Sequence, residues 1–179
     1  MRRPNHWNTS WDQAKFETVA HRWADLSERN YGVSLLNDCK YGHDIKDNVM
    51  RISLLRAGTQ PDHLQDQGEH TFTYALLPHK GDFVEGAVVQ EAFALNEPME
   101  TVSGKSLLPY ESFLSFDNDQ VELDAVKQSE DGKYLVLRFH EFAGSRQETS
   151  VKRTVAFLII RKSSRLRSVN QTVHGIHYC

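Results

Sequence analysis

The chain has few of the features that mark several common protein classes. Its 179 residues contain two cysteines, Cys39 and Cys179, which lie far apart in the sequence. Such sparse cysteines argue against a disulfide framework and against a thiolate metal site. We therefore expect a reducing setting and a cytoplasmic protein.

Long apolar runs and a strong net charge are also missing. The longest apolar stretch, Val155–Ile160, is strand-sized, whereas a membrane-spanning helix needs about 20 residues. Polar residues follow Arg2 and Arg3 where a secretory signal would be apolar. The net charge of −3, with 39% hydrophobic and 25% charged residues, is ordinary. We expect neither a membrane nor a nucleic acid as partner.

Catalytic and metal-binding motifs are missing as well. There is no GxSxG, and the nine histidines form no HExxH or Cys/His pattern. We expect His70 and His79 to be partly buried, hydrogen-bonding residues and not metal ligands. The acidic stretch from Asp117 to Asp124 resembles half a calcium loop but lacks its glycine and spaced glutamate. The sequence therefore predicts no catalytic residue, metal site or cofactor in this chain.

Strand patterns fill most of the length. Alternating or short apolar runs bounded by turn residues predict strands, and these runs are Lys15–Ala24, Val33–Leu36, Val49–Arg56, His70–Leu76, Ser112–Phe116, Val121–Lys127, Lys133–Phe142 and Val155–Ile160. The Asp131-Gly132 pair predicts a hairpin between the sixth and seventh of them. Helical spacing predicts one short helix within Phe83–Asn96, with Asp82 as its cap. The fold class is mainly all-β, an antiparallel β-sandwich with one short helix.

The segment Asp25-Leu26-Ser27-Glu28 separates two predicted strands and presents two carboxylates and a hydroxyl. One interpretation is a solvated connection whose side chains bond local backbone amides. The other is a loop that faces a polar ligand. Asp25 and Glu28 are near enough in sequence to act as a carboxylate pair, but nearness in a loop is no evidence for a glycosidase.

Several segments, in a fixed order over roughly residues 1 to 145, resemble one enzyme family. They are Arg3–Asp12, His21–Glu28, Tyr31–Asp38, Ser53–Arg56, Pro61-Asp62, Gly68–His79, Ala94–Pro98, Val126–Gly132 and Leu137–Glu141. They are similar to the C-terminal β-domain of the α-mannosidases of glycoside hydrolase family 38.

The resemblance implies a β-sandwich of the supersandwich, galactose-mutarotase-like kind, spanning residues 1–160, followed by an atypical basic tail at 161–179. It also implies a parent enzyme that is a zinc-dependent, retaining α-mannosidase. The zinc ion and the catalytic aspartates would lie in preceding catalytic and helical domains, which would be the partners of this chain. The chain alone would be inactive. Asp25, Ser27, Glu28 and Tyr31 would lie near the mannoside substrate.

Two alternatives stay open at this point. The chain could be a stand-alone carbohydrate-binding module, in which Trp7, Trp11, Trp23 or Tyr31 stacks on sugar rings. It could instead be a structural or oligomerising domain, including a homo-oligomer. A large exposed apolar patch would favour the structural role.

Overall fold

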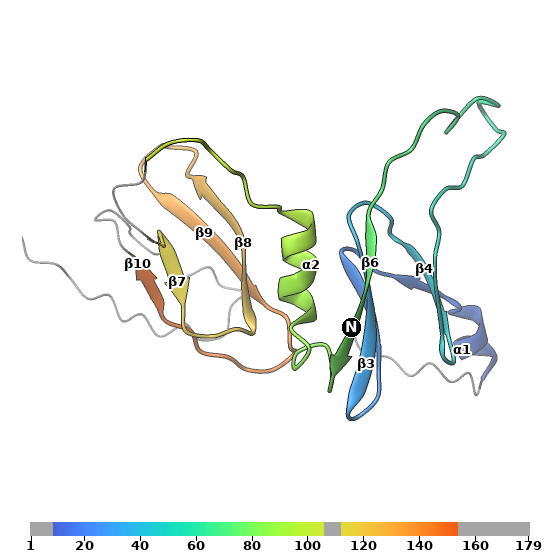
Figure 1. The fold of residues 1–179 in the computed structure, drawn as a ribbon, viewed down its shortest axis with the longest axis horizontal. Coiled ribbons are helices and arrows are strands. Elements are labelled where there is room, and N and C mark those ends of the chain that lie inside the picture. Colours follow the sequence, from blue (N-terminus) through green and yellow to red (C-terminus); the bar gives the residue numbers. More distant parts are fainter. Residues whose placement is uncertain (1–8, 106–111, 154–179) are drawn as a thin grey trace, which may run out of the picture. The chain divides into compact units, whose positions relative to one another are not determined.

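The computed structural model describes residues 9–105 and 112–153 (Figure 1). The chain divides into two compact units, Met1–Val102 and Ser103–Cys179, called here the N-terminal and C-terminal units. The described strands pair in antiparallel sheets, which confirms the mainly β fold class. None of the described helices is long and apolar enough to cross a membrane.

One three-stranded sheet of the N-terminal unit contains β2 (Trp23–Ser27), β3 (Tyr31–Asn37) and β6 (Tyr74–Lys80), in the order β2-β3-β6. The central strand β3 is the most buried of the three, and Ser34 and Asn37 on it are fully buried. A second sheet contains β1 (Glu17–Val19), β4 (Gly42–Lys46) and β5 (Val49–Ile52), in the order β1-β4-β5.

The predicted strand Lys15–Ala24 is two strands, and this prediction was therefore wrong in its extent. β1 pairs with β4, whereas β2 pairs with β3 in the other sheet. The alternation of side chains continues across the boundary, so periodicity alone does not reveal that the pairing partner changes. Two other predicted strands overlap shorter or shifted ones, since Val49–Arg56 contains β5 and His70–Leu76 overlaps β6.

The predicted helix is α2 (Val88–Asn96), which ends at Asn96 as expected. Its buried side chains Val88, Val89 and Ala92 lie on the side that packs against β3 and β2. Asp82 does not cap this helix. Its carboxylate accepts hydrogen bonds from the backbone N–H groups of Val84 and Glu85, at 2.9 and 3.2 Å, in the preceding turn.

A second, shorter helix, α1 (Ser10–Ala14), was not predicted. The hydroxyl of Thr9 accepts a hydrogen bond from the backbone N–H of Asp12 at 3.2 Å. This is an N-cap, and Thr9 followed three residues later by an acidic residue is a sequence signal for one. The prediction did not use that signal.

The C-terminal unit contains a long hairpin of β8 (Val121–Gln128) and β9 (Leu135–Glu141), together with β7 (Leu114–Phe116) paired to β10 (Val151–Arg153). The predicted Asp131-Gly132 turn is confirmed, with Gly132 at a φ of 70°. The rings of Phe116 and Phe139 meet edge to face at 5.5 Å. The predicted strand Val155–Ile160 and the basic tail at 161–179 lie outside the described residues.

Candidate functional site

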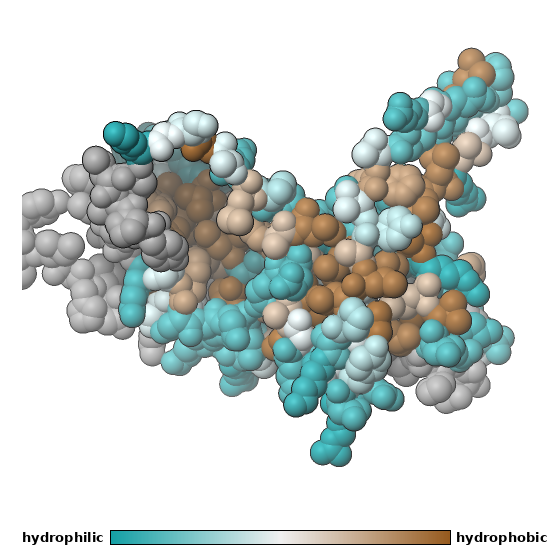
Figure 2. Space-filling view, viewed as in Figure 1, coloured by the Kyte–Doolittle hydropathy of each residue, from teal (hydrophilic) through white to brown (hydrophobic). Residues whose placement is uncertain are grey.

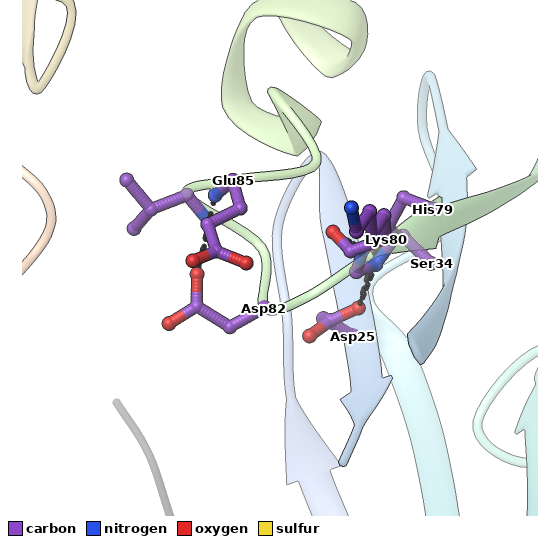
Figure 3. Close-up of polar contacts among 7 residues, drawn as sticks. Asp25, Ser34, His79, Lys80, Asp82 and Glu85 are labelled. Carbon is purple, nitrogen blue, oxygen red and sulfur yellow. Dashed lines mark hydrogen bonds and ion pairs between the residues drawn. The ribbon is translucent and has the colours of Figure 1, made fainter. Parts of the chain in front are cut away.

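Three buried polar side chains lie close together on one face of the β2-β3-β6 sheet (Figure 3). Asp25 lies opposite Ser34 across β2 and β3, and His79 lies opposite Gly32 across β3 and β6. Oδ1 of Asp25 is 2.8 Å from Nε2 of His79 and accepts the Ser34 hydroxyl at 2.7 Å. The side chains of His79 and Asp25 are 4% and 6% exposed. Strand register thus places one residue from each strand in a buried cluster, the Asp25–Ser34–His79 cluster.

Two glycines border the imidazole of His79. A Cβ at Gly32 would collide with Cε1 of the ring, and a Cβ at Gly86 would lie 2.5 Å from its Cγ and Nδ1. Gly86 belongs to the turn between β6 and α2, so the ring fits between a strand and this turn. Because glycine has no side chain, its backbone can approach the ring this closely. The expectation of a partly buried, hydrogen-bonding histidine is confirmed for His79. For His70 it was wrong about burial, because His70 is exposed, although its Nε2 is 2.8 Å from the carbonyl oxygen of Asp66.

The cluster resembles a nucleophilic triad in composition but not in arrangement. A nucleophilic serine must give its proton to a base and must meet a substrate. Here the Ser34 hydroxyl donates to Asp25, while its oxygen is 3.3 Å from Nε2 of His79. Ser34 is also fully buried. The arrangement therefore links three strands by side-chain hydrogen bonds, and its serine is not accessible to a substrate.

The segment predicted as a polar loop is largely strand. Asp25, Leu26 and Ser27 belong to β2, and the turn of the hairpin follows at Glu28. This loop prediction was wrong because the carboxylate of Asp25 finds partners on β3 and β6, which allow a charged residue inside a sheet. Sequence reasoning missed Ser34 and considered His79 only beside His70, not beside Asp25. Alternation along β6 puts His79 on the face of Ala75 and Leu77.

The four predicted substrate-proximal residues separate into two groups. Asp25 is held inside the cluster, whereas Ser27, Glu28 and Tyr31 are exposed on the hairpin between β2 and β3. The backbone N–H of Glu28 donates to the carbonyl of Tyr31 at 2.9 Å, which closes the turn, and Tyr31 is 50% exposed. These three residues form the exposed hairpin tip, fixed at its base by the cluster.

The aromatic residues considered for sugar stacking differ in exposure. Trp23 is half-buried and its ring stacks on Phe83 at 5.1 Å, so it belongs to the interior. Trp11 is 78% exposed and Tyr31 is 50% exposed. Trp7 lies outside the described residues. Among the candidates that the structure describes, Trp11 and Tyr31 are therefore the aromatic rings available to a ligand.

The acidic stretch that begins at Asp117 joins two loops of the C-terminal unit. Oδ1 of Asp117 accepts the backbone N–H of Ser150 at 2.6 Å and the hydroxyl of Thr149 at 3.2 Å. The backbone N–H of Ser150 is the main cause that holds the pKa of Asp117 below its ordinary value.

Within residues 9–105 and 112–153, no three His, Cys, Asp or Glu side chains gather as a metal site. The described part of the chain therefore provides no set of side chains that fits a zinc ion.

Two family models match the chain. Residues 1–64 match the one described as the glycosyl hydrolases family 38 C-terminal domain. Residues 120–173 match the one described as the glycosyl hydrolases family 38 C-terminal beta sandwich domain. The second match supports the sandwich architecture expected from the strand pattern.

Several curated relatives are α-mannosidases of much greater length. Human alpha-mannosidase 2C1 is 47% identical over 150 residues, covering 81% of this chain and 14% of the relative. Alpha-mannosidase G of Dictyostelium discoideum is 38% identical over 180 residues, covering 96% of this chain and 17% of the relative. This chain thus spans a small part of the relatives that it matches.

A solved structure has the same fold. The crystal structure of an alpha-mannosidase from Enterococcus faecalis V583 superposes with a TM-score of 0.68 and 22% sequence identity. The superposition covers 84% of this chain and 18% of that chain. It supports the architecture described above.

Proposed function

Because the chain belongs to the C-terminal region of glycosyl hydrolase family 38, we propose that it is the non-catalytic β-sandwich part of a longer, retaining α-mannosidase. In this proposal the zinc ion and the catalytic aspartates belong to other domains of the parent enzyme. The parent works in the cytoplasm, which suits the exposed free thiol of Cys39. Two matches to C-terminal models of the same family carry the proposal.

We further propose that the exposed hairpin tip, Ser27, Glu28 and Tyr31, forms part of the wall of the mannoside cleft. Its hydroxyl and carboxylate can bond sugar hydroxyl groups, and the half-exposed ring of Tyr31 offers an apolar face. The buried cluster supports this role, since Asp25 and His79 hold the strands at the base of the hairpin together. Sites on rigid elements keep side chains in place for binding.

The experiment compares the chain alone with the longer enzyme on an aryl α-mannoside, with zinc added to both. We expect no turnover by the chain alone. In the longer enzyme, Glu28→Ala and Tyr31→Ala should each lower kcat/KM about tenfold. This corresponds to about 1.4 kcal/mol, the size of one lost hydrogen bond for Glu28 or one lost ring contact for Tyr31. Glu69→Ala, at another exposed glutamate, is the control and should have no effect. Turnover that copurifies with the chain alone would refute the non-catalytic role.

One observation favours a second candidate, the carbohydrate-binding module. Trp11 is 78% exposed on α1, and exposed aromatic rings are suited to stacking on sugars. Titration of the chain with mannose and mannobiose, followed by NMR, distinguishes the two candidates. Shifts that centre on Trp11 in the isolated chain favour the module, whereas a cleft wall needs the rest of the enzyme to hold the sugar.

A further inference from the structure

The edge strand β6 carries an exposed apolar face. Side chains alternate along a strand, and on β6 Ala75, Leu77 and His79 lie on the half-buried to buried side. The residues of the opposite side are exposed, and they are Tyr74, Leu76, Pro78 and Lys80. Tyr74 is 55% and Leu76 67% exposed. We call Tyr74, Leu76 and Pro78 the β6 face. Figure 2 shows hydrophobic surface in the region where Figure 1 draws β6 and β3.

Burial changes abruptly between β3 and β6. Leu35 on β3 lies directly opposite Leu76 in the strand register, and the two side chains share one face of the sheet. Leu35 is 6% exposed, whereas Leu76 is 67% exposed. Covering a leucine side chain is favourable by about 1.5–3 kcal/mol. The apolar surface of this sheet therefore continues beyond the part that the N-terminal unit covers.

The chemistry of β6 favours side-chain packing over the addition of another strand. β6 is at the edge of its sheet. Pro78 has no backbone N–H to donate, and proline is typical of edge strands that do not pair further. Lys80 stands at the end of the same face, opposite Tyr31 in the register. A matching surface would be apolar in its middle, with an acceptor for the lysine at its rim.

We propose that the β6 face is the surface on which the rest of the same α-mannosidase polypeptide docks. This inference rests on the proposed function and adds the residues of the contact. The chain spans 14% of the human relative and 17% of the Dictyostelium relative, so most of such an enzyme lies outside it. Interfaces between domains of one polypeptide typically bury about 600–1,500 Å². The β6 face supplies the apolar centre of such an interface.

The test places a charge on the face in two settings, the isolated chain and the longer enzyme. Leu76→Asp is compared with Leu64→Asp, because Leu64 is 56% exposed in the segment between β5 and β6 and does not belong to the face. In the isolated chain both variants should keep the parent Tm. In the longer enzyme, Leu76→Asp should lower the Tm and the mannosidase activity, whereas Leu64→Asp should change neither. Iodination of Tyr74 should be several-fold slower in the longer enzyme than in the isolated chain.

Two outcomes would overturn the docking proposal, and a third would separate it from the proposed function. Equal behaviour of Leu76→Asp and Leu64→Asp in the longer enzyme, with equal labelling of Tyr74, overturns the proposal. A dimer of the isolated chain that protects Tyr74 and dissociates in Leu76→Asp overturns it too, because a second copy would then be the occupant. If Tyr74 is protected in a longer protein that lacks mannosidase activity, the docking surface stands and the proposed function fails.

Discussion

The imidazole of His79 lies 2.8 Å from the carboxylate of Asp25, which precedes it by 54 residues in the chain. Both side chains are almost fully buried. The contact joins β2 to β6 across β3, the strand that supplies Ser34. It makes the base of the exposed hairpin tip a rigid part of the N-terminal unit.

The Asp25→Ala substitution should therefore destabilise this unit. It removes the acceptor of both Ser34 and His79, and each buried donor left without a partner costs about 1–3 kcal/mol. Asp44→Ala is the matched control, since Asp44 pairs with Arg51 at 2.7 Å on a partly exposed surface, where ion pairs contribute at most about 1 kcal/mol. Urea unfolding followed by circular dichroism measures both. Equal losses would show that the buried cluster adds no more stability than this exposed ion pair.

Gly86→Ala should be destabilising because the new methyl group would press on the His79 ring. Overpacking of this kind costs about 1–3 kcal/mol. Gly104→Ala is the control, because nothing lies within 4 Å of a Cβ at Gly104. Thermal unfolding compares the two. The idea fails if Gly86→Ala unfolds at the same temperature as Gly104→Ala.

Val88→Ala should weaken the packing of α2 on the sheet. Val88 is 0% exposed, and removal of its two methyl groups should cost of the order of 2 kcal/mol. Val19→Ala is the comparison, because Val19 is 97% exposed and surface changes usually stay within about 0.5 kcal/mol. Chemical denaturation gives both values, and a loss for Val19→Ala as large as that for Val88→Ala would contradict the packing.

Asp117 should titrate below the ordinary aspartate pKa, because the N–H of Ser150 and the hydroxyl of Thr149 bond its charged form. A lowered pKa in the folded state contributes stability that is present above the unfolded pKa and is lost as the pH falls through the folded pKa. Carbon-detected NMR titration of the carboxyl group measures this. Thr149→Val should raise the pKa of Asp117 yet leave it below the ordinary value, since the Ser150 N–H is the larger cause. A pKa at or above the ordinary value in the unsubstituted chain would contradict the contact.

Several local features were predictable because their causes are local. The Asp131-Gly132 turn depends on a glycine with positive φ, and Gly132 adopts one. The end of α2 at Asn96 follows from turn residues nearby. The mainly antiparallel β class follows from alternating apolar residues. The order of the segments that resemble family 38 was sufficient to indicate the family, and the family models agree.

By itself, the sequence determined the strand-rich class, the main turns and the family, since each depends on residues close together in the chain or on their order. Only the tertiary structure decided that Asp25 is buried and which side chains it contacts. Alternation could not reveal that β1 and β2 belong to different sheets, or that β3 and β6 would bring Ser34 and His79 to this carboxylate. Strand register between distant segments is set by long-range packing, and this register buries Asp25 while it leaves Ser27, Glu28 and Tyr31 in solvent.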